Sequence, residues 1–506
     1  MRPDRSSVVL LALLLANAAA ILFFRFFITV DGPINVLHAS LLDVPWTERD
    51  HLAHGITYAS DALHVRLGHR ALMILLLFLS PAAAHDLFAA LVSCAVVLSV
   101  VAFLHVHGTR IGLAVLWLAP VTFNILLVMG LFHFLLGVAL AFGSVAWWKW
   151  RGDSRLWRWS GLLIGALLSW SAHRGAPILL CMLFLPMLLV ELHTARRTTG
   201  RIERRTLGWS IAFIGVLAIA TALRVGPAVR SIVRELPTEL PALSDSFLIR
   251  PLFLLDHAKE AWLVGSIGVL LFISFSAGVR VRWGLGRKFL WHDTLLAFLL
   301  LLALLSWIYG TPAGHRLFIT ERCQWLALLV LVLWLAAVAD ARRGWAAQTI
   351  RGAALCALPL HVARLVQAEE SFAHLQQVHL CAMEACDALA PGSLVVPVMA
   401  EPNPLLQHLE AYVAIDHDGI LVAPNEHLVL KLPSTMRSGR LRTEDPAWLM
   451  RHWRKGIPPV VDQVLFMGSG IERTVSKHPW PTLLGDRFRL SYDNGYARIY
   501  TVVHAE

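Results

Sequence analysis

The sequence predicts a mainly α-helical, polytopic membrane protein that carries a small α/β domain at its C-terminal end. Of its 506 residues 57% are hydrophobic and only 15% are charged, against about 25% in a typical soluble protein. Mean hydropathy is +0.62. Apolar blocks near the length of a membrane-spanning helix recur along the chain until about residue 366, and shorter apolar runs follow. This composition excludes a soluble enzyme, a disordered chain and a fibrous protein.

The first apolar run, from Val8 to Val30, follows Arg2 and Arg5. It exceeds the apolar stretch of a typical signal peptide, and we expect an uncleaved first span with its N-terminus inside. The apolar segment 71–84 is short, and we place it at the membrane interface or as a re-entrant piece. About eleven spans are then expected, the later ones near 87–106, 111–129, 131–150, 160–172, 176–193, 209–224, 262–279, 294–309, 323–339 and 352–366.

Basic residues indicate the orientation. Four clusters follow alternate blocks, and basic loops stay on the cytoplasmic side. The net charge of +10 is thus an orientation signal, and we expect no nucleic-acid partner. The opposite side receives the first loop (30–70), the turn at 172–175, the stretch 225–261, the loop 310–322 and everything after 366. The clusters are Arg151, Arg155 and Arg158; Arg196, Arg197, Arg201, Arg204 and Arg205; Arg280, Arg282, Arg287 and Lys288; and Arg342, Arg343 and Arg351.

The predicted domains are a membrane domain, 1–366, and an extracytoplasmic α/β domain, 367–506. Strand-length apolar runs lie at 393–399, 419–423 and 463–467, with helical candidates between them. The alternating runs on either side of Asn494-Gly495 predict a β-hairpin. In the same part, Cys381 and Cys386 can form a disulfide in an oxidising compartment, but not if both lie on one helix.

Asp31 is the most informative residue for chemistry, because Asp31-Gly32-Pro33 follows the first apolar run. A carboxylate there can act as a general base towards an acceptor hydroxyl or amide, or hold a divalent cation (Mg²⁺ or Mn²⁺) against a phosphate leaving group. The alternative is that Asp31 only caps the following helix. Asp31 with Asp50 and His54 is a candidate metal site, although such residues are also typical of a solvated amphipathic helix.

Other ionisable residues face the same predicted compartment. His133 flanks the junction between two blocks, His173-Arg174 forms a short turn, and Arg316 and Glu321-Arg322 border the loop before a late span. Ionisable groups at a membrane indicate a functional site, and guanidinium groups match phosphate or pyrophosphate. Interfacial snorkelling or local pairing with Glu321 are the alternatives.

With these features the sequence resembles the GT-C superfamily of integral-membrane glycosyltransferases. It is most similar to a poorly characterised bacterial branch whose first outer loop begins with Asp-Gly-Pro. The matching positions are Asp31-Gly32-Pro33, Gly130-Leu131-Phe132-His133-Phe134-Leu135-Leu136-Gly137, Ala172-His173-Arg174, Glu321-Arg322 and Gln407-His408-Leu409-Glu410-Ala411-Tyr412. Two positions depart from the branch: His133 replaces an Asn, and the first-loop His comes late, at His38.

The resemblance implies a polyprenyl-phosphate-linked sugar donor and a glycan, lipid or protein acceptor on the outer face of the bacterial inner membrane. Asp31 would be the catalytic carboxylate, which deprotonates the acceptor or holds a metal ion. His173, Glu321 and Arg322 would line the cavity and meet the lipid phosphate. Further substrate-binding candidates are His38, His133, Arg174 and Arg316. Inversion at the sugar carbon would follow from in-line attack, and the C-terminal domain would be periplasmic. The alternative function is a membrane transporter, or a scaffold for envelope polysaccharide assembly.

Overall fold

The structure, a computed structural model, divides by internal contacts into two units. Unit 1 comprises Met1–Phe24 and Ala89–Glu369, and unit 2 comprises Arg25–Phe88 and Glu370–Glu506. The residues described are 5–22, 27–43, 56–58, 67–151, 154–173, 175–199, 208–216, 219, 249–254, 257–286, 290–309, 318–390, 393–401, 403–406, 409, 411–412, 420–421, 428–430, 462–477 and 480–503.

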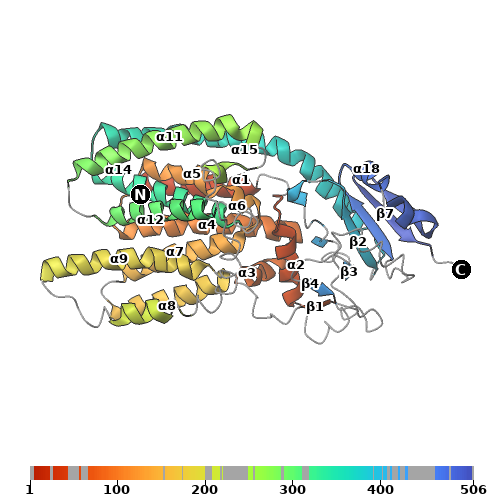
Figure 1. Cartoon of the computed structure of the whole chain (residues 1–506), viewed down its shortest axis with the longest axis horizontal. Helices are drawn as coiled ribbons and strands as arrows, with labels where there is room; N and C mark the ends of the chain where they lie inside the picture. Colours follow the sequence, from red (N-terminus) through yellow and green to blue (C-terminus); the bar gives the residue numbers. More distant parts are fainter. Residues whose placement is uncertain are drawn as a thin grey trace. The chain divides into compact units, whose positions relative to one another are not determined.

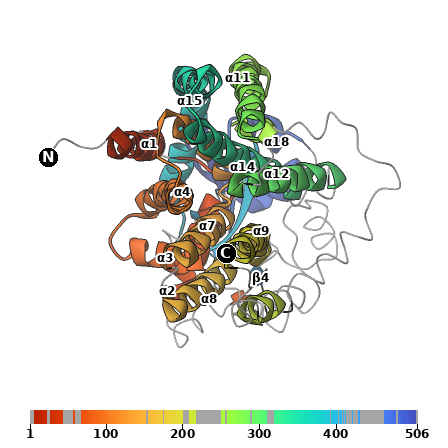
Figure 2. The same cartoon turned by 90° about the vertical axis from the view of Figure 1, so that its left-hand side faces the viewer.

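Unit 1 is a helical bundle. Its long helices run alongside one another in Figure 1 and are seen nearly end-on in Figure 2. Two further helices, α4 (Pro81–Val106) and α15 (Trp345–Cys386), contribute residues to both units. The other helices of unit 1 are α1 (Arg5–Leu22), η3 (Leu113–Trp117), α5 (Leu118–Thr122), α6 (Ile125–Val128), α7 (Phe132–Trp150), α8 (Arg155–Ala172), α9 (Ala176–Thr199), η5 (Arg250–Leu252), α11 (His257–Gly284), α12 (Trp291–Ile308) and α14 (Ile319–Ala341).

Seven helices in the described residues are long and apolar enough to cross a membrane, namely α4, α7, α9, α11, α12, α14 and α15. Three shorter apolar stretches lie at Val8–Leu22, Leu67–Leu76 and Leu113–Val128. The mainly helical, polytopic fold is therefore confirmed. Among these seven helices α14 is the most enclosed, because 89% of its most apolar 18-residue stretch is buried. A helix that is apolar on all sides belongs in the interior of a bundle, and α14 buries Trp325 and Trp334 there.

Two predicted spans have different ends. The first apolar run was expected to be helical to Val30, but α1 ends at Leu22, and residues 27–30 are buried without being helical. The block 111–129 is not one helix. Asn124 accepts hydrogen bonds from the N–H groups of Leu126 and Leu127, so it caps α6 and interrupts the run.

The segment 71–84 contains the end of one helix and the start of the next. Helix α3 (Leu67–Leu76) has ten residues, about 15 Å at 1.5 Å per residue, roughly half of the hydrocarbon thickness. Helix α4 begins at Pro81, six residues before the predicted span at 87. Ser80 precedes it and accepts a hydrogen bond from the Ala83 N–H (3.4 Å), and proline is favoured in a first helical turn.

Helix α15 has 42 residues and continues through position 366, where the membrane domain was expected to end. Cys381 and Cys386 both lie on it and form no disulfide with each other. Their five-residue spacing within one helix explains why, because it keeps the two sulfur atoms apart.

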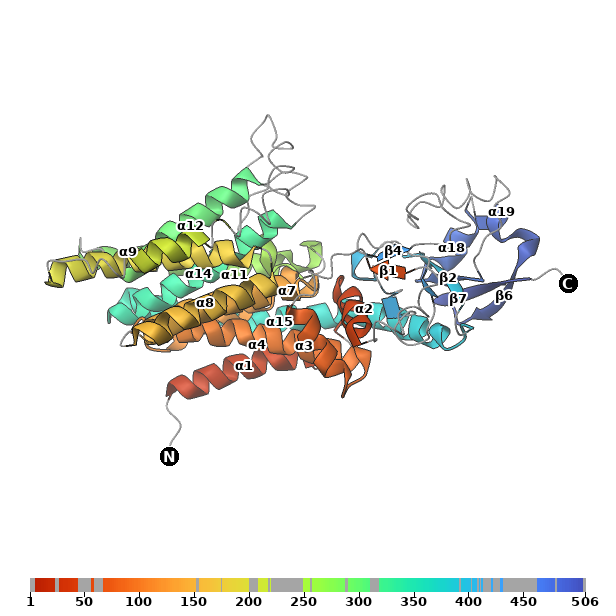
Figure 3. The same cartoon turned by 90° about the horizontal axis from the view of Figure 1, so that it is seen from below.

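Unit 2 includes α2 (Gly32–Asp43), which packs against α3, as Figure 3 shows. It also contains a five-stranded sheet of order β3-β2-β5-β7-β6, and a two-stranded pair of β1 (Ile56–Tyr58) with β4 (Leu428–Leu430). Strand β2 pairs in parallel with β3 and β5, whereas β7 pairs antiparallel with β5 and β6. The other bounds are β2 (Leu394–Met399), β3 (Ile420–Leu421), β5 (Gln463–Met467), β6 (Phe488–Asp493), β7 (Ala497–Val502), η6 (Pro404–Leu406), α18 (Ile471–Val475), α19 (Trp480–Leu484) and η8 (Gly485–Arg487).

The predicted strands and the Asn494-Gly495 hairpin are confirmed. Gly495 has φ of 85°, and Asn494 accepts hydrogen bonds from Tyr496 N and Ala497 N. The positive φ accounts for a glycine in this turn. The predicted helix at 446–455 lies outside the described residues, and of the candidate at 403–414 only the short η6 is described as helical.

The sheet core gives a first test of stability. Phe466 is fully buried and packs against Trp480 and Tyr500, at ring-centroid distances of 4.9 and 5.7 Å. Phe466→Ala is expected to lower the free energy of unfolding by about 3–5 kcal/mol, because it leaves a cavity. Thermal unfolding of the full chain in detergent measures this. The control is Leu490→Ala, whose side chain is exposed, and equal effects of the two changes would contradict the described core.

Candidate functional site

Asp31 stands in unit 2 directly before α2, in the N-cap position. Its backbone carbonyl accepts the Asn35 N–H at 3.0 Å, and its side chain is only half-buried. Residues 27–30 are not helical, so Gly32-Pro33 does not lie at the end of the first apolar helix. Those two residues form the first turn of α2, where the missing N–H of proline removes no helical hydrogen bond.

A buried hydrogen-bonded relay lies against this helix start. Thr29 Oγ1 is 2.9 Å from His85 Nε2, and His85 Nδ1 is 2.9 Å from Asp86 Oδ1. The same carboxylate oxygen accepts the Phe27 N–H at 3.2 Å. Thr29 and His85 are each 1% exposed, and Asp86 is 8% exposed. The sequence prediction missed all three relay residues, because Thr29 fell inside the first apolar run, and His85 and Asp86 precede the span predicted to start at 87.

The relay leaves room only for a glycine at position 32, the first residue of α2. A Cβ atom at position 32 would lie 2.2 Å from both His85 Nε2 and Thr29 Oγ1. Real Cβ contacts are far longer, so any side chain here would push the helix start and the relay apart. The backbone that carries Asp31 is thus in close contact with the His85–Thr29 pair.

Polar groups continue along α2 at the spacing of one helix face. Asn35 and His38 follow Asp31 by four and seven residues, so the three positions share a face. His69 of α3 meets this face, with its Nε2 3.4 Å from Asn35 Oδ1 and its ring centroid 5.3 Å from that of His38. The structure therefore places a second imidazole, which the sequence prediction missed, beside predicted His38.

The predicted metal site cannot be assembled from the described residues. Asp50 and His54, its other two members, lie outside them. Within the described ranges, no group of three His, Cys, Asp or Glu side chains is arranged to hold a metal ion. A role for Asp31 in holding a divalent cation stays a prediction.

A second cluster of predicted residues lies in unit 1 around the ring of Phe134. His173 packs edge-on against this ring, with centroids 5.4 Å apart, and the Arg322 guanidinium carbon lies 5.2 Å from the ring centroid. The structure thus brings His173 and Arg322 together through one aromatic ring. An arginine over an aromatic face gains a cation–π attraction.

The other predicted residues of unit 1 have separate surroundings. Glu321 lies in the first turn of α14, and its carboxylate is 3.9 Å from Arg250 Nη1, a partner from outside the predicted loop. His133 is the second residue of α7 and is 3% exposed, so its side chain lies in the core. Arg174 and Arg316 lie outside the described residues.

The turn that holds His173 is packed closely against α7. The Gly175 N–H donates to His173 Nδ1 at 3.0 Å, and a Cβ atom on Gly137 would lie 2.8 Å from Ala176 Cβ and 3.2 Å from His173 Cβ. Only a glycine at 137 allows this approach of the turn to the helix.

Gly137→Ala is therefore expected to lower the free energy of unfolding by about 1–3 kcal/mol, because it overpacks this contact. The matched control is Gly143→Ala on the same helix, where the nearest atom would be 3.9 Å from the new Cβ. That change should stabilise by about 0.5–1 kcal/mol, since alanine favours helix over glycine. Thermal midpoints in detergent measure both, and shifts of the same sign would contradict the described packing.

A buried cation that sequence reasoning passed over also lies in unit 1. Arg364 of α15 is fully buried and donates to the carbonyls of Leu252 (2.5 Å), Phe123 (2.8 Å) and Pro120 (3.2 Å). It joins α15 to the chain segments around η5 and α5. A charged residue inside the apolar block 352–366 is a signal from which Arg364 could have been predicted.

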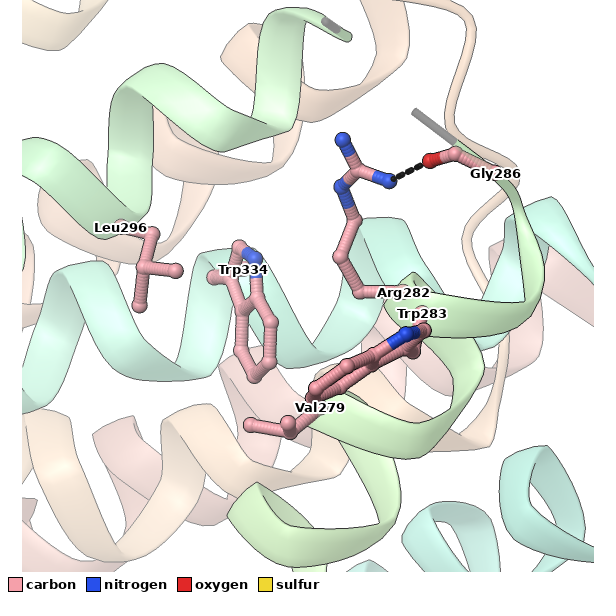
Figure 4. A pocket seen from close by; sticks show the side chains of 6 residues that line it. All are labelled: Val279, Arg282, Trp283, Gly286, Leu296 and Trp334. Carbon is pink, nitrogen blue, oxygen red and sulfur yellow. Dashed lines mark hydrogen bonds between the residues drawn. The ribbon is translucent and has the colours of Figure 1, made fainter. Parts of the chain in front are cut away.

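The pocket in Figure 4 lies elsewhere in unit 1 and has a volume of about 470 Å³. Arg282, its charged lining residue, donates to the Gly286 carbonyl (2.8 Å) and pairs with Asp293 through Nη2 (2.7 Å). The lining contains none of the predicted site residues: it consists of Val279, Arg282, Trp283, Gly286, Leu296 and Trp334.

Fold and site together define a multi-pass helical membrane protein that also contains a small sheet. No family model and no curated protein matches the chain. Among solved structures, it is similar to the arabinofuranosyltransferase AftD from mycobacteria, determined by single-particle cryo-EM, with a TM-score of 0.49 and 14% sequence identity. The match covers 100% of this chain and 40% of the AftD chain, so this chain spans less than half of that protein.

Proposed function

We propose that the chain is an integral-membrane glycosyltransferase of the GT-C type, which transfers a sugar from a polyprenyl-phosphate donor to a glycan, lipid or protein acceptor. The observation that carries the proposal is the half-buried Asp31 carboxylate at the start of α2, whose backbone is packed against a buried Thr–His–Asp relay. The motifs that resemble the GT-C superfamily, above all Asp31-Gly32-Pro33, support the same reaction class.

In the proposed reaction, Asp31 acts as the general base. The acceptor oxygen attacks the sugar C1 in line with the leaving group, and its proton passes to the Asp31 carboxylate. A new acceptor O–C1 bond forms while the bond from C1 to the phosphate oxygen breaks. Polyprenyl phosphate leaves with the electron pair of the broken bond, and the sugar carbon is inverted.

Imidazoles and guanidinium groups are proposed to bind the donor phosphate. His38 and His69 lie on or against the α2 face that begins at Asp31, where their N–H groups can donate to phosphate oxygens. In unit 1, His173 and Arg322, which meet at Phe134, are proposed as a separate set of phosphate-binding residues, with Arg174, Arg316, Glu321 and His133 as further substrate-binding residues. A Mg²⁺ or Mn²⁺ ion on Asp31 is an alternative way to neutralise the leaving phosphate.

We place the site on the outer face of a bacterial inner membrane, with the N-terminus in the cytoplasm and the C-terminal domain in the periplasm. The basic clusters support this orientation, because Arg and Lys favour the cytoplasmic loops. The C-terminal sheet is proposed to shape the acceptor site.

The test uses purified full-length chain in detergent with a panel of polyprenyl-phosphate-linked sugars and an envelope extract as the acceptor. We expect release of free polyprenyl phosphate together with a sugar-labelled acceptor, for at least one donor. A transporter or scaffold would leave the sugar–phosphate bond intact. Intact donor across the panel, with correctly folded protein, would contradict the proposal.

A further inference from the structure

His85 and Asp86 of the relay contact the chain at three places, two just before α2 and one at its first residue. Asp86 Oδ1 accepts the Phe27 N–H, His85 Nε2 meets the Thr29 hydroxyl, and Gly32 lies against both the imidazole and that hydroxyl. Two adjacent side chains of α4 therefore contact the backbone at Phe27 and Gly32 and the side chain of Thr29. Asp31 lies within this contacted stretch.

The hydrogen bonds of the relay run from the Asp86 carboxylate through the His85 imidazole to the Thr29 hydroxyl. The Asp86 carboxylate is an acceptor, so the His85 Nδ1–H donates to it, and His85 Nε2 then faces Thr29 Oγ1. A carboxylate that holds one imidazole nitrogen fixes both the tautomer and the orientation of the ring. The orientation of His85 in turn sets the position of Thr29 and of the Gly32 backbone.

Burial separates the relay from any substrate. Thr29 and His85 are each 1% exposed, whereas Asp31 beside them is half-buried. A relay that substrate cannot reach acts on the reaction only through the residues it positions. Misplacement of a reacting group by about 1 Å can cost roughly 100-fold in rate, so such positioning matters.

We propose that Thr29, His85 and Asp86 are positioning residues that hold the Asp31 carboxylate in its reactive place. This inference rests on the proposed function of Asp31 as the base. It assigns a role to three residues that stand outside the motifs of the sequence resemblance, and it explains why a glycine follows the acid.

The test compares Thr29→Val with Thr29→Ser. Valine keeps the shape of threonine but removes the hydroxyl, whereas serine keeps the hydroxyl. We expect Thr29→Val to lower kcat for sugar transfer about 10–100-fold with KM within about threefold, since the substrate contacts are intact. Thr29→Ser should restore kcat to within a few-fold of the wild-type value.

Thr122→Val is the matched control for the loss of a buried hydroxyl. Thr122 is 3% exposed and donates to Asn17 Oδ1 at 2.7 Å, in unit 1. Both valine variants should lower the thermal midpoint by similar amounts, but Thr122→Val should retain kcat. If the two variants have equal kcat while Asp31→Asn is inactive, the positioning role is overturned and the proposed function stands.

Hydrogen exchange gives a readout that does not depend on transfer. The Asn35 N–H bonds to the Asp31 carbonyl, so its exchange rate reports on the start of α2. Thr29→Val should speed exchange at this amide at least tenfold, and Thr122→Val should leave it unchanged. Unchanged exchange in Thr29→Val overturns the proposal, even where the wild-type chain transfers no sugar and the proposed function itself fails.

Discussion

Asp31→Asn is expected to lower kcat for sugar transfer by about 100- to 10,000-fold, the range for loss of a general base. Asparagine has nearly the same shape and keeps the capability to cap α2, but its amide cannot accept the acceptor proton. KM for the donor should therefore change little. The assay follows the release of polyprenyl phosphate by purified protein in detergent.

This prediction separates the two roles of Asp31, because Asn and Asp cap helices about equally well. If Asp31 only starts α2, Asp31→Asn should retain both its fold and its activity. Asp340→Asn serves as the control for a lost carboxylate, since Asp340 accepts the Arg110 N–H at the end of α14. Equal kcat values for the two variants would show that Asp31 is not the general base.

Arg364→Met is expected to lower the free energy of unfolding by about 3–5 kcal/mol, a loss large enough to leave little folded protein in the membrane. The guanidinium group donates to three carbonyl oxygens, and methionine leaves these buried acceptors without those donors. Arg364→Lys should recover only part of the stability, because a single ammonium cannot span three acceptors.

The matched control for this change is Arg351→Met on the same helix. Arg351 is only partly buried and donates to one described carbonyl, that of Ala339, at 2.7 Å. Its loss should cost about 1 kcal/mol. Thermal midpoints and the folded yield from membranes compare the two variants, and equal yields would show that Arg364 does not hold these segments together.

Local patterns were sufficient to predict much of the fold. The hairpin at Asn494-Gly495 depends on neighbouring residues alone, and the short apolar runs became strands β2, β3 and β5. Helix ends were harder to predict. Hydropathy does not distinguish a helix from the buried non-helical residues 27–30, and it does not register the Asn124 cap that interrupts residues 113–128.

The candidate site was predictable only in part. Asp31 and His38 could be found because a first loop after an apolar run is a defined place in a sequence. His69, His85 and Asp86 join them through tertiary contacts between α2, α3 and α4, which no spacing rule reports. The cluster at Phe134 has the same origin, since His173 and Arg322 are far apart in the chain.

Photolabelling with a diazirine analogue of polyprenyl phosphate tests most directly whether the donor phosphate binds at Asp31. The protein is irradiated in detergent, digested, and its labelled peptides are identified by mass spectrometry with and without excess natural polyprenyl phosphate. We predict competed labelling within residues 27–43 or 67–88, the segments that carry Asp31, His38, His69 and His85. Competed labelling confined to segments that carry none of the proposed phosphate-binding residues, such as the pocket lined by Trp283 and Trp334, would contradict the assignment of the site.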